Sequence, residues 1–350
     1  MKKVLIDFYR LKHVHSGLGY FSKQLSRFLL ENNTNKHLTF LVPKSFANSY
    51  NKLCQTEVFS LLRKFFPMLL GNYEIWHSIS QFPSILPPRG KAKFILTIHD
   101  LNFLYEKSEA KQQKYIRRLQ KRVNRADAIT TISHFTKSNI EEYLNVNGKK
   151  IHVIYNGVDS PGLTKPKMPD WIENEAFFFS IGYFTKKKNW EPLIHMMTEF
   201  PNQKLVISGF NETSYGKECR QIIDELGLGN RVILSGPVSN EEKSWLFANC
   251  IAFLFPSIAE GFGMPAVEAM KMGKPTFLST HTSLPEIGGD AAFLFSSFEK
   301  NHMKSVVESG LKLVEKNPEK FAEKIRAHAQ KFDWQIAAKQ YLALYDKLLS

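Results

Sequence analysis

The segment from residue 255 to residue 275 constrains the fold of this chain more than any other stretch. The apolar residues 250–255 lead into it, and an apolar run without alternation is typical of a strand buried in a parallel sheet. A glycine-rich loop follows, and then a helix for which Pro265 suits the first position and Gly273 the position after the last turn. This order of strand, glycine loop and helix predicts a site where backbone N–H groups bind a phosphate or a sugar hydroxyl.

Two glutamates flank this loop, Glu260 before the turn and Glu268 within the helix. Seven residues separate them, so both carboxylates can face the same crevice from opposite sides of the glycine turn. An isolated pair of this kind is more often two solvated surface residues. The interpretation therefore depends on the segment as a whole.

The whole segment resembles the Glu-x7-Glu motif of retaining glycosyltransferases of family 4, which have the two-Rossmann GT-B fold. The matching residues are Pro256, Ser257, Glu260, Gly261, Phe262, Gly263, Pro265, Glu268, Ala269 and Met270, and residues 282–286 and 289–292 continue the match. The resemblance implies an α/β protein with two Rossmann-like domains that face each other across a cleft. It also implies a C-terminal helix that crosses back to the first domain.

Three regions follow from this resemblance and from the order of strands and helices. Residues 1–160 are expected to form an N-terminal Rossmann-like acceptor domain, and residues 161–332 a C-terminal Rossmann-like domain for a nucleotide-sugar donor. Residues 333–350 would be the helix that packs back on the first domain. The proline-rich residues 160–169 are predicted to link the two domains.

Gly17 and Gly19 lie in a predicted loop between a first strand, residues 4–8, and a helix that carries Phe21. This order is typical of the opening of a Rossmann-like domain, whose ligands bind at the carboxyl ends of the strands. The spacing is a poor dinucleotide fingerprint, because Ser22 stands at the position of the third glycine. The resemblance implies that the two glycines let a sugar diphosphate approach the backbone; the alternative is a plain turn.

His99 follows directly after the apolar strand 92–98, at the predicted edge of the crevice. A lone histidine is more often packed in a core than in contact with a ligand. The string at residues 97–101, however, is similar to that of mannosyltransferase-like members of family 4. In them this histidine faces the donor sugar.

Lys187 and Lys188 lie at a turn between a strand that ends in Gly182 and a helix from Trp190. Cations at such a turn can neutralise a diphosphate, although a lysine run is commonly only a solvated surface. Lys188 matches the lysine of the family, whereas Tyr183 stands where many members have an arginine. Whether Lys187 supplies the missing charge stays open.

The resemblance also assigns further residues to the donor. Glu260 would bind hydroxyls of the donor sugar and Glu268 those of the ribose, while the backbone around Gly236 would hold the nucleobase. The remaining residues expected in the donor site are Gly261, Phe262, Gly263, Met264 and Pro265. Glu260, His99 and Lys188 are the residues predicted to act in catalysis.

The positive charge of the chain lies entirely in its first half. Residues 1–160 carry 25 Lys and Arg against 11 Asp and Glu, whereas residues 161–350 carry 22 of each. Such asymmetry is typical of a protein that binds a polyanionic partner, either nucleic acid or an anionic membrane. The alternative is a basic surface without a binding role. Residues 58–70 are either an amphipathic segment on a membrane or a core helix that ends at Pro67, and we favour the membrane. A basic helix at residues 111–125 adds seven cations.

Several sequence features exclude other classes of protein. No uncharged apolar run is long enough for a transmembrane helix, and the first apolar stretch is too short for a signal peptide. Three scattered cysteines indicate a reducing compartment without a disulfide framework. Neither metal-ligand spacing of Cys and His nor an Asp-x-Asp motif occurs, so we expect no metal and no cofactor besides the donor itself.

The expected activity is transfer of a sugar from a nucleoside diphosphate to a hydroxyl of a glycan or a lipid-linked acceptor, with retention at the anomeric carbon. The resemblance favours GDP-mannose as donor, with UDP-sugars second. The expected setting is the synthesis of cell-surface polysaccharide or lipopolysaccharide, in the cytoplasm on the inner face of a membrane. Two alternatives stay open: a nucleotide-sugar epimerase of the same fold, and a basic nucleic-acid-binding protein, which we rank last because no RNA-binding motif is present.

Overall fold

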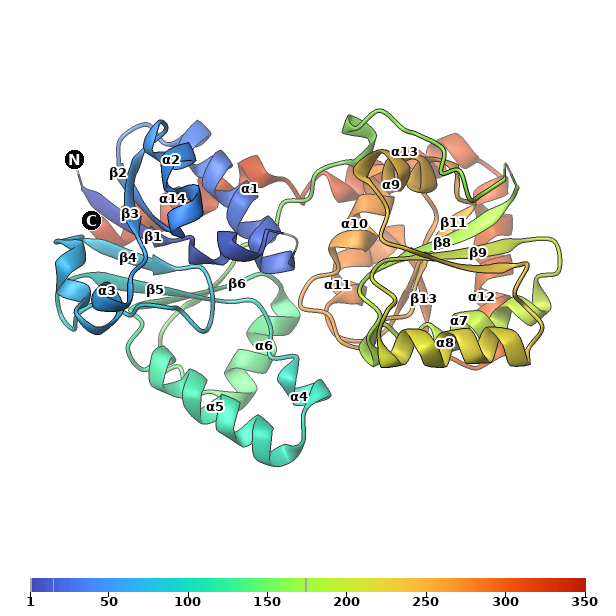
Figure 1. Cartoon of the computed structure of the whole chain (residues 1–350), viewed down its shortest axis with the longest axis horizontal. Helices are drawn as coiled ribbons and strands as arrows, with labels where there is room; N and C mark the ends of the chain where they lie inside the picture. The colour runs from blue at the N-terminus through green and yellow to red at the C-terminus, as the bar shows by residue number, and fades with distance from the viewer. Residues whose placement is uncertain (1, 15, 174) are drawn as a thin grey trace. The chain divides into compact units, whose positions relative to one another are not determined.

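The structure is a computed structural model that describes residues 2–14, 16–173 and 175–350. It divides into two compact units, one formed by Met1–Gly157 with Phe332–Ser350 and the other by Val158–Lys331 (Figure 1). The predicted domain limits were residues 160 and 332. Each unit is built on a parallel sheet with helices on its faces, so the predicted fold class of two Rossmann-like domains is confirmed.

The sheet of the first unit has the strand order β3-β2-β1-β4-β5-β6-β7. Its strands are β1 (Lys3–Asp7), β2 (His37–Val42), β3 (Gln55–Val58), β4 (Ile75–Ser78), β5 (Lys93–Ile98), β6 (Ala128–Thr131) and β7 (Ile151–Val153). All neighbouring strands are parallel. The strand order reverses between β1 and β4, and sheets of this kind bind ligands at the carboxyl ends of the strands beside such a point.

Helices cover both faces of this sheet. They are α1 (Gly17–Asn32), α2 (Lys44–Asn51), α3 (Leu61–Phe65), α4 (Phe103–Glu106), α5 (Glu109–Val123), α6 (His134–Tyr143) and α14 (Trp334–Leu349), with the 3-10 turns η1 (Tyr9–His13) and η2 (Pro67–Leu70). Figure 1 shows α1, α2 and α14 on one face and α5 on the other. The C-terminal helix α14 therefore belongs to the first unit.

The helix α14 supplies large side chains to the core between α1 and the sheet. Trp334 lies against Phe21, with 5.7 Å between ring centroids, and Tyr345 is fully buried. Gly157 passes so close to Trp334 that a Cβ at position 157 would overlap it. This packing explains why the chain returns to the first unit after completing the second.

The predicted loop at Gly17 and Gly19 is wrong in one respect, because both glycines lie in the first turn of α1. Ser16 caps this helix, and its Oγ accepts a hydrogen bond of 3.1 Å from the backbone N–H of Gly19. A Cβ at position 19 would overlap the carbonyl of His13. Gly19 is therefore required by the close approach of η1 to α1.

Residues 58–70 form two short turns, α3 and η2, rather than a core helix. Large apolar side chains of this segment are exposed, among them Phe65 at 73 % and Met68 at 61 %, while Leu70 is buried. The alternative of a core helix that ends at Pro67 is wrong, because α3 has no buried residue and only the two ends of the segment are packed.

The sheet of the second unit has the order β10-β9-β8-β11-β12-β13, again with parallel neighbours. Its strands are β8 (Phe177–Ile181), β9 (Lys204–Ser208), β10 (Val232–Gly236), β11 (Ala252–Phe255), β12 (Thr276–Ser279) and β13 (Phe293–Phe295). Its helices are α7 (Glu191–Met196), α8 (Ser214–Glu225), α9 (Asn240–Asn249), α10 (Met264–Lys271), α11 (Leu284–Gly288), α12 (Lys300–Glu315) and α13 (Pro318–Ala329). The strand order reverses between β8 and β11, so the loops after these two strands meet at the edge where a ligand is expected.

Short 3-10 turns complete this unit, namely η3 (Pro161–Leu163), η4 (Lys186–Lys188), η5 (Met197–Glu199) and η6 (Gly289–Ala291). Among the helices of the described residues, none is long and apolar enough to cross a membrane.

Candidate donor site

The loop between β11 and α10 has the geometry that the glycine pattern predicts. Gly263 is the N-cap of α10 with φ 101° and ψ 48°, a left-handed conformation that favours glycine. The helix begins at Met264, so Pro265 is its second residue and not its first. Gly273 follows the last turn with φ 72°, as predicted for a helix that ends in a glycine.

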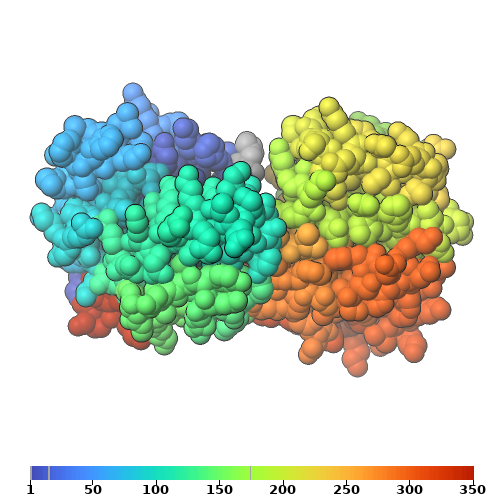
Figure 2. Space-filling model, turned by 90° about the horizontal axis from the view of Figure 1, so that it is seen from below, coloured from blue at the N-terminus to red at the C-terminus, as the bar shows by residue number. Residues whose placement is uncertain are grey.

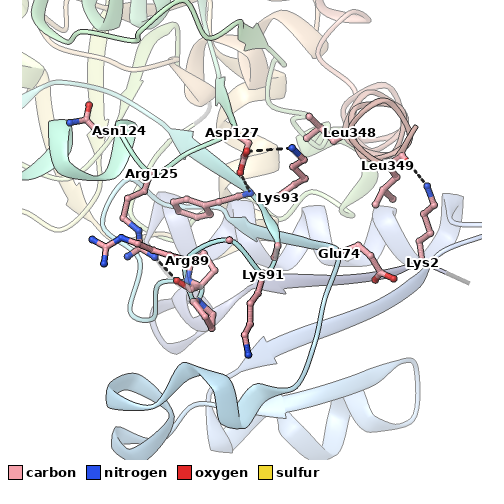
Figure 3. A pocket seen from close by; sticks show the side chains of 15 residues that line it. Lys2, Glu74, Arg89, Lys91, Lys93, Asn124, Arg125, Asp127, Leu348 and Leu349 are labelled. Carbon is pink, nitrogen blue, oxygen red and sulfur yellow. Dashed lines mark hydrogen bonds and ion pairs between the residues drawn. The ribbon is translucent and has the colours of Figure 1, made fainter.

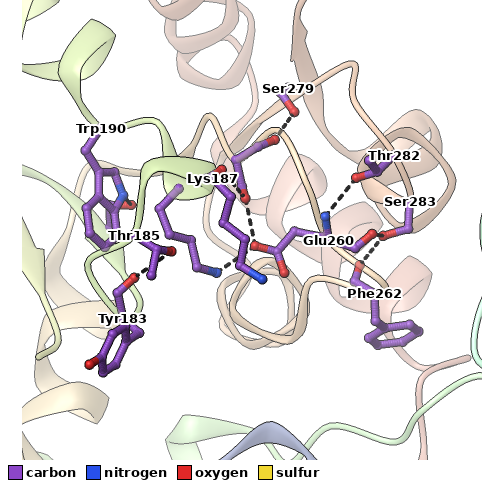
Figure 4. Close-up of polar contacts among 12 residues, drawn as sticks. Tyr183, Thr185, Lys187, Trp190, Glu260, Phe262, Ser279, Thr282 and Ser283 are labelled. Carbon is purple, nitrogen blue, oxygen red and sulfur yellow. Dashed lines mark hydrogen bonds and ion pairs between the residues drawn. The ribbon is translucent and has the colours of Figure 1, made fainter. Parts of the chain in front are cut away.

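Side chains from neighbouring strands and loops fix this loop in place (Figure 4). The backbone N–H of Glu260 donates to Thr282 Oγ1 at 3.0 Å. The Ser283 hydroxyl shares its proton between the carbonyls of Glu260 at 3.0 Å and Phe262 at 3.1 Å. Because these bonds join residues more than 20 positions apart, the loop is positioned by tertiary structure rather than by its own turn chemistry.

Lys188 and Glu260 form an ion pair at this loop, with 2.6 Å between Nζ and Oε1. Ser257 Oγ donates a second hydrogen bond to the same carboxylate oxygen at 2.7 Å. The Lys188 ammonium also lies 4.6 Å from the ring centroid of Phe255, within the range of a cation–π interaction. The side chains of Lys188 and Glu260 are only 11 % and 14 % exposed, so water screens their attraction weakly.

The surroundings keep the Glu260 carboxylate ionised. Burial alone would raise its pKa, but the charge of Lys188 and the hydrogen bonds from Lys188 and Ser257 outweigh burial, so the pKa of Glu260 is lowered. An ionised carboxylate that accepts hydrogen bonds is suited to bind sugar hydroxyls.

Lys187 belongs to the same cluster. Its carbonyl accepts a hydrogen bond from Ile258 N–H at 2.8 Å and, at 3.0 Å from Ser257 Oγ, shares the Ser257 proton with Glu260. These contacts tie the turn η4 to the loop after β11. Figure 4 shows the Lys187 side chain extending toward Glu260. The structure therefore brings Lys187 and Lys188 close to Glu260, which lies more than 70 positions later in the sequence.

Tyr183, at the position of the arginine in many family members, is 56 % exposed and stacks on Phe210. Their ring centroids lie 5.4 Å apart with an interplanar angle of 20°. Phe210 was missed by the sequence analysis, although it follows a strand that ends in glycine, as Tyr183 does. The two rings form an exposed aromatic surface after β8 and β9.

Glu268 takes part in a different ion pair, with Lys243 of α9 at 2.8 Å between Nζ and Oε1. The structure thus places the two glutamates of the motif against separate lysines. Lys243 is a further charged residue that the sequence analysis missed, because nothing in the sequence relates the face of α9 to that of α10.

The other donor-site candidates of this unit lie at the ends of β10 and β11. Gly236 ends β10 with φ 75°, and its carbonyl accepts a hydrogen bond of 2.8 Å from the Gly209 N–H. Phe262 is buried beside Gly261 in the loop that precedes α10. Their contacts with a nucleotide stay a prediction.

His99 belongs to the first unit and is buried at the carboxyl end of β5. Its Nε2 lies 2.7 Å from the carbonyl of Ile79, so this nitrogen carries the proton, and Phe21 packs edge-on against the ring. Burial lowers the pKa of His99 to about 4, which leaves the imidazole neutral near pH 7. Its proposed contact with a donor sugar stays a prediction.

No group of three or more His, Cys, Asp or Glu side chains with the geometry of a metal site occurs among residues 2–14, 16–173 and 175–350. The sequence-based expectation that the protein works without a divalent metal stays a prediction.

The two parallel-sheet units and the cationic loop at the N-terminus of α10 define a protein of the GT-B class. Two family descriptions match the chain: "Glycosyl transferases group 1" over residues 164–332 and "Glycosyltransferase Family 4" over residues 27–160. The chain belongs to this family of glycosyltransferases. The assignment favours neither the epimerase nor the nucleic-acid-binding alternative.

The chain also has distant relatives of known name, at less than 30 % sequence identity. The O-antigen chain mannosyltransferase RfbU of Salmonella typhimurium is 28 % identical over 215 residues, which cover 61 % of this chain and 60 % of RfbU. The serotype-specific mannosyltransferase WbdA of Escherichia coli is 26 % identical over 296 residues, which cover 78 % of this chain but 36 % of WbdA. The chain thus spans less than two thirds of the length of both relatives.

Solved structures share the fold. Anabaena Alr3699/HepE in complex with UDP-glucose superposes with a TM-score of 0.76 at 20 % identity, covering 99 % of this chain and 100 % of that one. Sucrose-phosphate synthase of Thermosynechococcus elongatus gives a TM-score of 0.75 at 18 % identity, with 100 % and 99 % covered.

Proposed function

We propose that this protein transfers a hexosyl group, with mannose as first choice, from a nucleoside diphosphate sugar to a hydroxyl of a glycan. The glycan would belong to a cell-surface polysaccharide or lipopolysaccharide under assembly on the cytoplasmic side of a membrane. The O-antigen mannosyltransferases among the relatives support both the sugar and the pathway class.

The observation that carries this proposal is the pair of Lys188 and Glu260 at the N-terminus of α10. The leaving group of the reaction is a nucleoside diphosphate, whose charge grows as the glycosidic bond breaks. A nearly buried ammonium and the positive end of a helix dipole are suited to stabilise that charge. The adjacent carboxylate is suited to hold hydroxyls of the sugar that departs from the diphosphate.

We further propose that the reaction retains the anomeric configuration. Glu260 accepts hydrogen bonds from both Lys188 and Ser257, which suits a hydroxyl ligand better than an attacking nucleophile. The acceptor oxygen would then bond to the face of the anomeric carbon that the diphosphate leaves, and the departing phosphate oxygen would take the acceptor proton. GDP-mannose is the first expected donor, and UDP-sugars are the second.

A thermal-shift series with GDP-mannose, UDP-glucose, GDP and UDP tests the donor assignment. A ligand at 100 times its dissociation constant stabilises the protein by about 2.7 kcal/mol, so binding raises the unfolding temperature measurably. Lys188→Met should abolish this rise. Lys186→Met should not, because Lys186 lies in the same turn with its side chain 77 % exposed and paired with Glu218.

Sugar transfer is then measured with the donor that binds. The anomeric configuration of the product tests retention, and the activity after EDTA treatment tests metal independence. Retained configuration and full activity in EDTA support the proposal. An inverted product would refute retention, and activity restored only by manganese would refute metal independence.

A further inference from the structure

A groove of about 810 Å³ lies beside α5 in the first unit. One wall comes from residues 61–67, and the other from residues 82–89 together with the C-terminal half of α5. Figure 2 shows α5, in teal, on the surface of the molecule. The volume falls within the range of about 300 to 1,000 Å³ that is typical of pockets for small ligands.

Five cations line this groove: Lys64, Arg89, Arg118, Arg122 and Arg125. Among the described residues of its lining, no aspartate or glutamate offsets them. A neighbouring cavity of about 630 Å³ shares Arg89 and Arg125, whose side chains lie side by side in Figure 3. The groove is therefore a local concentration of uncompensated positive charge.

The arrangement of these arginines is costly in the absence of an anion. Burial and the charges of Arg118 and Arg125 lower the pKa of Arg122, and burial and the charge of Arg89 lower the pKa of Arg125. The Nε of Arg122 is buried without a hydrogen-bond partner among the described residues. A polyanion bound here would supply the missing acceptor and relieve the repulsion.

The ring of Phe82 keeps two of the guanidinium groups in position. Arg118 and Arg122, one helical turn apart on α5, lie 4.7 and 5.3 Å from the ring centroid of Phe82. Planar guanidinium groups held in this way match the oxygens of a phosphate better than a flexible ammonium does.

An exposed apolar segment adjoins the groove, which Leu61, Phe65 and Pro67 of this segment line. Leu61, Leu62, Phe65, Phe66, Met68 and Leu69 are each more than half exposed, and all belong to the consecutive residues 61–69. Several exposed large apolar side chains within one short segment indicate an interaction site. Anion-binding and hydrocarbon-binding surfaces thus lie side by side, which is the pattern that an amphiphile with a phosphorylated head requires.

One end of the groove reaches the carboxyl edge of the sheet. Tyr9 and Phe59, which follow β1 and β3, line this end and pack together with 4.1 Å between ring centroids. Ligands of such sheets bind at this edge, so an acceptor that lies in the groove has its sugar near the carboxyl ends of the strands.

We propose that this groove binds the diphosphate of an acceptor glycan that is attached to a long hydrocarbon chain. The arginines hold the diphosphate, residues 61–69 contact the start of the hydrocarbon chain, and Tyr9 and Phe59 face the glycan. This inference rests on the proposed function, because it names the class of acceptor.

Isothermal titration with farnesyl diphosphate, kept below its micelle-forming concentration, tests the groove directly. Farnesol and inorganic pyrophosphate are the comparison probes, since each has only half of the required chemistry. Farnesyl diphosphate should bind about tenfold or more tightly than either, because charged hydrogen bonds and apolar burial both contribute. Equal affinity for inorganic pyrophosphate would overturn the proposal.

Matched variants separate the groove from the general charge of α5. Arg118→Gln/Arg122→Gln should weaken farnesyl diphosphate binding about tenfold or more. Arg117→Gln/Lys121→Gln removes the same charge at the same spacing from exposed positions outside the groove, and should leave binding unchanged. Unchanged thermal unfolding confirms that each variant is folded, and an equal loss in both variants would overturn the proposal.

Two further measurements identify the hydrocarbon contact and the source of the phosphate. Leu61→Ser/Phe65→Ser should weaken farnesyl diphosphate binding but leave pyrophosphate binding unchanged. Adsorption to phosphatidylglycerol vesicles should fall equally in both charge variants. If farnesyl diphosphate binding also falls equally in both, the arginines serve the bilayer surface and the proposal is wrong.

Nucleotide-sugar binding by the unsubstituted protein keeps this proposal distinct from the proposed function. A protein that binds a nucleotide sugar but not farnesyl diphosphate refutes only the acceptor class. A protein that binds no nucleotide sugar refutes the proposed function, whatever the groove binds.

Discussion

If a donor binds as proposed, the Lys188 and Glu260 side chains exchange partners. A diphosphate at the helix N-terminus would compete with Glu260 for the Lys188 ammonium, and sugar hydroxyls would then replace the ammonium as partners of the carboxylate. Such pre-positioned charges cost little reorganisation at the moment of reaction.

The first prediction concerns these two side chains. Lys188→Ala and Glu260→Ala should each reduce kcat by about tenfold to a thousandfold, the range for loss of one transition-state contact. Lys186→Ala is the matched control, because it removes a lysine of the same turn whose side chain is largely exposed. Steady-state transfer assays measure the effect, and wild-type rates in both site variants would refute the assignment.

The second prediction concerns Asp7, which is buried at the end of β1. Burial raises its pKa to about 6 from 3.8, although the Tyr9 N–H and Arg10 act in the opposite direction. A raised pKa in the folded state gives stability that is fully present below pH 3.8 and lost as the pH rises to about 6. Ionisation of Asp7 therefore costs the folded protein roughly 3 kcal/mol at neutral pH, because a pKa difference of one between the folded and unfolded states corresponds to about 1.4 kcal/mol.

Asp7→Asn removes this titration. The unfolding temperature of this variant should therefore rise relative to that of the wild type as the pH increases from 4 to 7. The measurement is thermal unfolding of both proteins across that range. Asp170→Asn, at an exposed position, is the control and should show no such trend. A constant difference between Asp7→Asn and the wild type would contradict the raised pKa.

Some site residues could be predicted from the sequence because their motif is local. The positions of Glu260 and Gly263 around one turn follow from a strand, a glycine loop and a helix start within 20 residues. The partnership of Glu268 with Lys243 could not be predicted, since it depends on how α9 and α10 pack. Likewise, the distance between Lys188 and Glu260 depends on the neighbouring positions of β8 and β11 in the sheet.

At the level of elements, the start of α10 depends on a single left-handed residue. Gly263→Ala would place a Cβ 2.7 Å from Leu284 Cδ2 and force a non-glycine residue to φ 101°. We expect a loss of stability of about 1–3 kcal/mol and a lower affinity for the nucleotide sugar, because the N–H groups of the helix start would move.

Gly229→Ala is the matched control for this third prediction, since nothing lies within 4 Å of a Cβ there and its φ is not in the left-handed region. Thermal unfolding and the thermal-shift affinity measure the two effects. Equal stability of the two variants would show that the strain at position 263 is relieved by a small movement.

Sequence patterns predicted the existence of elements better than their ends. The start of α1 was placed after its two glycines, whereas capping by Ser16 brings both into the helix. Residues 58–70 are as apolar as a core helix, and composition alone could not show that the sheet leaves them uncovered. Whether an apolar segment is buried depends on the elements that reach it, and those come from distant parts of the chain.

At the level of the whole molecule, the excess charge of residues 1–160 and the exposed residues 61–69 belong to the same unit. Each cation near an anionic membrane contributes about 1 kcal/mol to binding, and the apolar side chains can enter the headgroup region. We propose that this unit adsorbs to the inner face of an anionic membrane.

The fourth prediction is co-sedimentation with phosphatidylglycerol vesicles but weak co-sedimentation with phosphatidylcholine vesicles. Binding should fall sharply in 1 M salt, where the screening length shrinks to about 3 Å. Equal binding to both kinds of vesicle, or binding to neither, would show that the charge serves another purpose.

The return of α14 to the first unit also determines when that unit can finish folding during protein synthesis. Trp334, Tyr341 and Tyr345 fill its core, yet the ribosome makes them only after the whole of Val158–Lys331. At about 5–20 residues per second, the first unit waits on the order of ten seconds or more with this part of its core unfilled. The second unit is continuous in sequence and can complete its fold first, so the order of completion on the ribosome is opposite to the order of synthesis.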